Sequence, residues 1–162
     1  MGEMGTGKTH ESTGECCAIS NEEYTTIQRG LMTHTIILAE LIKRGYEVVL
    51  PWGDHHRYDL GYVEQSEDTT GVKLIRVQCK TAWISQDSAC LQFNTATTHT
   101  NRKFQRKGYQ GCIECFAVYS PDTEKVYIIP IEDVADTSMN LRLKETKNHQ
   151  TKGIKWAKDY EL

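Results

Sequence analysis

The chain has 162 residues, of which 38% are hydrophobic and 25% charged, and its formal net charge is −3. This length and composition suit one folded domain with a core and exclude a disordered chain. The negative charge excludes nucleic-acid binding driven by overall charge, so a DNA-binding surface would have to be a local basic patch. No apolar run reaches the ~20 residues of a membrane span and no signal-peptide segment is present, so we expect a cytoplasmic protein that contacts no membrane.

Residues 1–24 have little periodicity, and we expect a flexible arm followed by a folded domain over 25–162. Within the arm, GEMGTGKT at positions 2–9 matches the phosphate-binding loop pattern G-x-x-x-x-G-K-T. A working loop of this type follows a strand and opens a helix, whereas the residues after Thr9 are poor helix formers. We therefore do not expect ATP binding here.

The next segment, 25–44, is the best helix candidate, with Gly45 suited to the position after its end. Its apolar stripe is Ile27, Leu31, Leu38 and Leu41, and His34 falls on the same stripe. His34 is either a core histidine bonded to a neighbour or a site residue that points inward.

A β-hairpin is predicted from segments 58–65 and 72–83, because both are rich in strand formers and residues 66–71 favour a turn. A short strand at 47–51 and a polar loop at 52–57 precede it. Alternation places Gln78 and Lys80 on one face of the second strand, with Asp59 beside them on the first. An acid, an amide oxygen and an ammonium group at one place could hold a hard divalent cation and a water molecule.

A strand at 89–94 is followed by the densest basic stretch of the chain, 95–108, which contains no acid. This stretch is either a solvated charged loop or a surface that binds phosphates, and its lack of acids in an acidic chain favours phosphates. The candidate DNA-binding residues, for the backbone or for base edges, are Arg57, Thr95, Asn101, Arg102, Lys103 and Arg106.

The remaining elements are a hairpin formed by 112–120 and 125–131, a short helical turn near 132–134, a strand at 140–143 and a terminal helix or docking segment at 154–160.

Several of these segments together resemble the PD-(D/E)XK nucleases, in particular the small homing endonucleases associated with group I introns. The resemblance spans about residues 28–160, and its most specific parts are LPWGD at 50–54, RYDL at 57–60 and RVQCKT at 76–81. FAVY at 116–119, VYIIP at 126–130 and NLRL at 140–143 are also similar. The bare D…Q-x-K signature is weak evidence, whereas this ordered set is strong.

The resemblance implies roles for individual residues. Asp59 would be the metal-binding acid, and Gln78 would take the position that many members give to Glu or Asp. The backbone carbonyl of Cys79 would also bind the metal, which would be Mg²⁺ or Mn²⁺. Lys80 would orient or activate the attacking water and stabilise charge on the phosphate.

The resemblance also implies an α/β (α+β) fold with a restriction-endonuclease-like core, in which a mixed four- to five-stranded sheet has flanking helices. It implies a metal-dependent endonuclease that hydrolyses phosphodiester bonds in double-stranded DNA, site-specific in the manner of homing endonucleases, and a homodimer or homotetramer. Two alternatives stay open: a DNA-binding protein of this fold with impaired catalysis, and a Holliday-junction resolvase or restriction-like nuclease.

One departure from the family pattern concerns the helix at 25–44. Related sequences have a glutamate where this chain has His34. Losing a carboxylate removes a hard oxygen ligand for Mg²⁺, and imidazole suits Mn²⁺ and later transition metals better. With His34 at this position, three possibilities stay open: an active enzyme with altered metal preference, a slow enzyme, or a DNA-binding relic.

Overall fold

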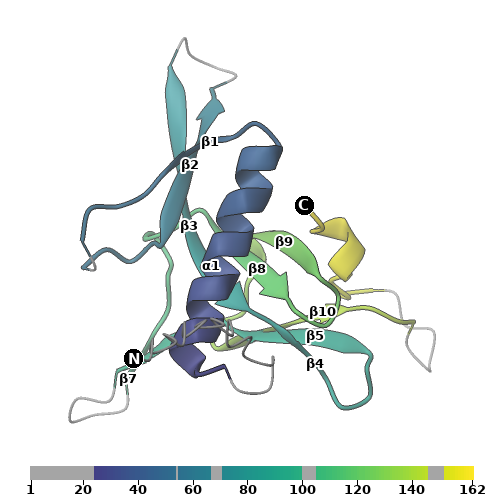
Figure 1. Ribbon diagram of the computed structural model, residues 1–162. Coiled ribbons are helices and arrows are strands. Elements are labelled where there is room, and N and C mark those ends of the chain that lie inside the picture. The colour runs from purple at the N-terminus through teal and green to yellow at the C-terminus, as the bar shows by residue number, and fades with distance from the viewer. Residues whose placement is uncertain (1–23, 54, 67–70, 100–104, 146–151) are drawn as a thin grey trace, which may run out of the picture.

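A computed structural model describes residues 24–53, 55–66, 71–99, 105–145 and 152–162 (Figure 1). The expected flexible arm, with its phosphate-loop-like segment, lies outside the described residues except for Tyr24. Among the described residues, no helix has the length and apolar character needed to cross a membrane.

Helix α1 (Thr26–Lys43) confirms the predicted helix. Thr25 caps its start: its hydroxyl accepts a hydrogen bond from the Gln28 backbone N–H at 3.2 Å, and the Gln28 side chain accepts one from the Thr25 N–H at 2.9 Å. At the other end Gly45 has a φ of 83°, a left-handed conformation that glycine adopts without strain.

The predicted apolar stripe of α1 was wrong in part. Ile27 and Leu31 are 77% and 62% exposed, and the buried residues are Thr33, Ile37 and Leu41. Thr33 can be buried because its hydroxyl lies 2.7 Å from the hydroxyl of Thr81 and forms a hydrogen bond with it. A pattern of apolar residues alone does not include a buried threonine, so it predicted a different side of the helix as the buried one.

The main sheet has five strands in the order β1-β2-β3-β8-β9. The β2–β3 and β8–β9 hairpins are antiparallel, as predicted, whereas β3 and β8 run parallel, so the sheet is mixed. Its strands are β1 (Glu47–Val49), β2 (Leu60–Gln65), β3 (Val72–Thr81), β8 (Cys115–Ser120) and β9 (Lys125–Pro130). This arrangement confirms the mixed sheet and the α+β class.

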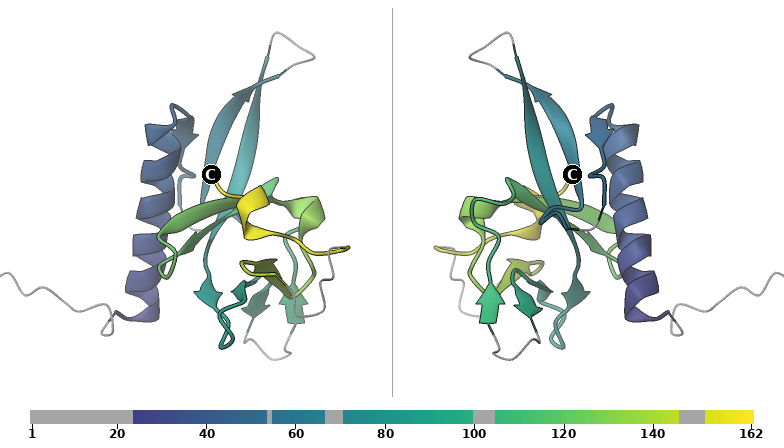
Figure 2. Two further views of the ribbon diagram at one scale, coloured as in Figure 1. Left: turned by 90° about the vertical axis from the view of Figure 1, so that its right-hand side faces the viewer. Right: turned by 90° about the vertical axis from the view of Figure 1, so that its left-hand side faces the viewer.

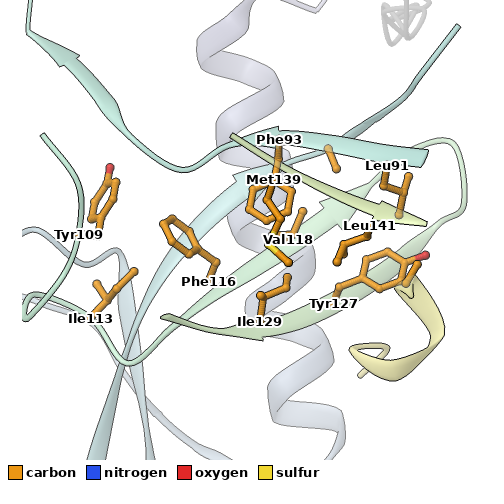
Figure 3. Packing of buried hydrophobic residues seen from close by; sticks show 12 residues of the cluster. Leu91, Phe93, Tyr109, Ile113, Phe116, Val118, Tyr127, Ile129, Met139 and Leu141 are labelled. Atoms are coloured by element: carbon orange, nitrogen blue, oxygen red, sulfur yellow. The ribbon is translucent and has the colours of Figure 1, made fainter. Parts of the chain in front are cut away.

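The two faces of the main sheet are covered differently, as Figure 2 shows. Helix α1 packs on one face, where Ile37 and Leu41 join a core with Val77 and Ala117. The other face is covered by a three-stranded sheet in the order β10-β5-β4, whose members are β4 (Trp83–Ile84), β5 (Cys90–Asn94) and β10 (Ser138–Arg142). Strands rather than a second α-helix thus enclose the core drawn in Figure 3.

The basic stretch at 95–108 contributes a two-stranded hairpin, not a plain loop. Strand β6 (Thr97–His99) pairs antiparallel with β7 (Gln105–Lys107), and residues 100–104 lie outside the described part of the chain. Of the basic residues in this stretch, Arg106 and Lys107 lie on strand β7.

The predicted short elements near the C-terminus are single turns. Ile131–Asp133 is one 3₁₀ turn and Ala157–Asp159 is another. The terminal segment docks by isolated bridges: Trp156 pairs with Arg142, and Glu161 pairs with Tyr127. It is therefore a docking segment with one helical turn.

Gly61 lies in β2, between Val49 of β1 and Arg76 of β3. A Cβ atom at Gly61 would lie 2.8 Å from Leu74 Cδ1 and 3.2 Å from the Ile75 backbone oxygen. The leucine tip can move aside, but the backbone oxygen belongs to the sheet and cannot move without disturbing it. The close packing of the three strands therefore requires glycine here.

We expect Gly61→Ala to lower the free energy of unfolding by about 1–3 kcal/mol, because the added methyl overpacks the sheet. Gly30→Ala is the matched control: nothing lies within 4 Å of a Cβ at this helical position, and alanine favours helix by about 1 kcal/mol over glycine. Urea unfolding of both variants measures the difference. A Gly61→Ala protein as stable as the wild type would contradict the packing argument.

Candidate active site

Asp59 directly precedes β2, at the point where the pairing of β2 with β3 stops. Its backbone N–H donates to the Val77 carbonyl at 2.8 Å. Its side-chain Oδ2 accepts a hydrogen bond from the Cys79 backbone N–H, also at 2.8 Å. The carboxylate thus replaces the backbone acceptor that a continued strand would offer, and it stays fixed against β3 at the point where β2 begins.

Gln78, the residue before Cys79 on β3, also contacts Asp59. Its side chain is 9% exposed, and its Nε2 donates to Asp59 Oδ2, the oxygen that also accepts from Cys79. A glutamine amide carries both a donor and an acceptor, so turning it over would present Oε1 at the same place. The structure therefore brings together Asp59 and Gln78 as the sequence predicted.

The environment raises the pKa of Asp59 above its ordinary value of 3.8. Partial burial is the main cause, because removing water disfavours the charged form. The Cys79 N–H and the nearby charges of His34 and Lys80 oppose this effect by lowering the pKa. The carboxylate is thus partly dehydrated and lacks full compensation, which is the situation that a bound cation would relieve.

His34 reaches this site from α1 on the other side of β3. Its charge lowers the pKa of Asp59, so the two groups are close enough to interact electrostatically. Its Nε2 is buried and has no hydrogen-bond partner among the described residues. A core histidine bonded to a neighbour through Nε2 does not fit this environment, and a residue turned toward the site does.

Lys80 lies two positions beyond Gln78 and next to Tyr109, a residue that sequence analysis missed. Lys80 Nζ is 3.5 Å from the Tyr109 hydroxyl, and Arg57 Cζ lies 4.7 Å from the centre of the Tyr109 ring. Arg57 Nη2 also donates to the Gly108 carbonyl at 2.8 Å. No motif marks Tyr109 in the sequence; its position directly after the basic stretch was the available signal.

The other candidate DNA-binding residues have different outcomes. Thr95 is 3% exposed, and its hydroxyl donates to the Ala135 carbonyl at 2.5 Å. Its expected contact with base edges is therefore corrected, because the side chain stabilises a strand end inside the protein. Arg106 lies on β7, opposite Thr98. Asn101, Arg102 and Lys103 lie outside the described residues.

The chemistry of the available ligands fits a hard divalent cation. Among the described residues, no three His, Cys, Asp or Glu side chains come together to hold a metal ion. A metal at Asp59 would thus need other oxygens, and the Gln78 amide and the Cys79 backbone carbonyl are the candidates. Burial raises the pKa of the Cys79 thiol, so its sulfur stays protonated and is a poor ligand.

Comparison with known proteins concerns the fold and the family of the chain. A search of curated proteins found no match. The solved structure of a bacterial homing endonuclease, I-Ssp6803I, is similar in fold, with a TM-score of 0.66 and 22% identity over 85% of this chain and 89% of that one. A model of the PD-(D/E)XK endonuclease family matches residues 24–162, a range that includes every residue that the structure describes. The chain therefore belongs to the PD-(D/E)XK endonuclease family.

Proposed function

We propose that this protein is a metal-dependent DNA endonuclease that hydrolyses phosphodiester bonds, and that it is a site-specific homing endonuclease. The observation that carries the proposal is the contact of Asp59 with Gln78 and Cys79, with Lys80 next along the same strand. Membership of an endonuclease family supports the reaction class. The likeness in fold to a homing endonuclease supports the narrower assignment.

In this proposal Asp59, the Gln78 Oε1 and the Cys79 carbonyl hold Mg²⁺ or Mn²⁺. A cation bound there would polarise the scissile phosphate and lower the pKa of a bound water. Lys80 holds the attacking water by a hydrogen bond and offsets the charge that builds on the phosphate oxygens. Arg57, fixed by Gly108 and Tyr109, offers its guanidinium to the DNA backbone.

Double-stranded DNA is the partner that the family implies, and the β6–β7 hairpin is the proposed surface beside the site. The sequence gives β7 both Arg106 and Lys107, which can neutralise phosphates. A homodimer or homotetramer matched to a roughly symmetric site completes the proposal. Exposed apolar residues on one side of α1, Ile27, Leu31 and Ile42, support contact between copies.

We expect Asp59→Asn and Lys80→Ala to abolish cleavage while the fold is retained, because each removes a group that the reaction needs. The measurement is cutting of supercoiled plasmid that carries the gene's own flanking sequence, with Mg²⁺ and separately with Mn²⁺, alongside circular dichroism. Asp136→Asn and Lys73→Ala change exposed residues of the same types and serve as controls. Undiminished cutting by either site variant would refute the assignment.

The raised pKa of Asp59 also predicts an effect on stability. The folded state holds the proton of such a carboxyl more tightly than the unfolded state does. The resulting stabilisation is complete when the pH is below the unfolded pKa of 3.8, and it is lost as the pH rises through the folded pKa. At about pH 7 the ionised Asp59 therefore destabilises the metal-free fold relative to a neutral isostere.

We accordingly expect Asp59→Asn to melt at a higher temperature than wild type at about pH 7 in EDTA. The gain should shrink as the pH falls through the folded pKa of Asp59 and disappear below 3.8. Thermal melts across this pH range measure it. An Asp59→Asn protein that melts at or below the wild-type temperature at neutral pH would contradict the burial argument.

His34 favours a second candidate function, a DNA-binding protein of this fold without catalysis. The sequence resemblance assigns His34 to the position of a family carboxylate, and its buried Nε2 has no hydrogen-bond partner among the described residues. A site without that carboxylate would bind Mg²⁺ more weakly. Such a protein would bind DNA without metal, with a steep salt dependence, and would cut in neither metal.

Comparing wild type with His34→Glu separates the two functions. We expect the wild-type enzyme to cut faster in Mn²⁺ than in Mg²⁺, because imidazole suits Mn²⁺ better. His34→Glu should then raise the Mg²⁺-dependent rate. The reading of His34 as a metal-tuning residue fails if both proteins show the same Mn²⁺ to Mg²⁺ ratio. Cutting by His34→Glu alone would identify the wild type as the DNA-binding form.

A further inference from the structure

We propose that Tyr109 is a positioning residue of this site: its hydroxyl holds Lys80, its ring holds Arg57, and both are tied to the β6–β7 hairpin. The inference rests on the proposed function, because it concerns how the same site keeps its lysine in place.

Tyr109 is itself held firmly. It is 6% exposed, and its ring meets that of Phe116 edge-on with 5.3 Å between centroids. Figure 3 shows it at one end of the core, beside Ile113 and Phe116, with its hydroxyl directed away from Ile113. The hydroxyl lies 2.7 Å from the Thr97 hydroxyl. A side chain packed and bonded in this way is a rigid support for other groups.

Lys80 needs such a support. Its ammonium sits at the end of a flexible four-carbon chain, which loses rotamer entropy when it is held in one position. Lys80 Nζ lies 3.5 Å from the Tyr109 hydroxyl but 5.3 Å from the ring centre, so the hydroxyl is the nearer contact. Removing that oxygen would therefore take away the hydrogen bond to Lys80 and leave only its contact with the ring, which lies within cation–π range.

Arg57 uses a different part of the same side chain. Its Cζ lies over the ring at 4.7 Å, within the range of a cation–π interaction. The ring also helps to orient the guanidinium, whose Nη2 donates a hydrogen bond to the Gly108 carbonyl. Removing the hydroxyl alone should thus leave Arg57, and with it DNA affinity, unchanged.

Thr97 extends this arrangement to the hairpin. It is the first residue of β6, and its hydroxyl bond to Tyr109 connects the proposed DNA-binding surface to the lysine through a single side chain. A substitution at Thr97 should therefore alter the position of Lys80, although no contact between Thr97 and Lys80 is changed directly. Thr97→Val should reproduce part of the loss seen when the Tyr109 hydroxyl is removed.

The decisive variant is Tyr109→Phe, which keeps the ring and removes the hydroxyl. We expect its single-turnover cleavage rate to fall about 10- to 100-fold, the scale of loss for a misplaced catalytic group. Its Kd for DNA, measured with Ca²⁺, should stay within twofold of wild type. Tyr109→Leu, which also removes the ring, should in addition weaken DNA binding.

Tyr127→Phe is the matched control. Tyr127 is 2% exposed, and its hydroxyl lies 3.1 Å from that of Thr123, so this variant also removes a buried tyrosine–threonine bond. Tyr127→Phe should lose similar stability and cut at the wild-type rate. Equal loss of rate in the two variants would show that only stability matters and would overturn the proposal.

A readout without DNA tests the same contact. In protein labelled with ¹³C at lysine, the two Hε protons of Lys80, assigned with Lys80→Ala, should be distinct in the wild type because the side chain is held. They should average in Tyr109→Phe and remain distinct in Tyr127→Phe. Unchanged Lys80 signals in Tyr109→Phe would overturn the inference.

Cleavage by Lys80→Ala and by Tyr109→Phe distinguishes an error in the proposed function from an error in the role of Tyr109. If Lys80→Ala cuts as well as wild type, the proposed role of Lys80 is wrong. If Lys80→Ala is inactive while Tyr109→Phe cuts at the wild-type rate, the endonuclease assignment stands and the positioning role of Tyr109 is refuted.

Discussion

The hydrogen bond from the Cys79 backbone to the Asp59 carboxylate is the contact on which the rest of the site depends. Through it a side chain takes the place of a backbone acceptor at the point where β2 begins, so the acid is fixed by the sheet itself. Gln78 and Lys80 follow by strand alternation on the same β3. A site built on a strand in this way is held more accurately than one built on loops.

The sheet that carries this contact is covered on both faces. Strand β3 is central in the sheet, and its parallel partner β8 is buried along its whole length. Helix α1 covers one face, and the β10-β5-β4 sheet covers the other. Because both covers pack on apolar residues, β3 is rigid, while Asp59 at the start of β2 remains only partly buried.

Charge is gathered locally in this protein. The chain as a whole carries a formal charge of −3, yet Lys80 and Arg57 both meet Tyr109, and His34 acts on Asp59 from the helix. Two cationic side chains gathered on one tyrosine, with Lys80 acting on the partly dehydrated Asp59, suit a polyanion that approaches together with a cation.

The sequence by itself determined the features that depend on neighbouring residues. The helix after residue 25, the turn at Gly45 and the β2–β3 and β8–β9 hairpins depend on local patterns, and the structure contains each of them. The approach of Asp59 to Gln78 also followed, because a hairpin brings its two strands together in a register set by sequence.

Only the tertiary structure decided the contacts between distant segments. Tyr109 is 29 positions from Lys80, and Thr33 is 48 positions from Thr81, and no local pattern links either pair. The same holds for the burial of Thr95 and for the side of α1 that faces the sheet. These features depend on how packed surfaces fit and on which polar groups find partners, and a periodicity within one segment contains neither kind of information.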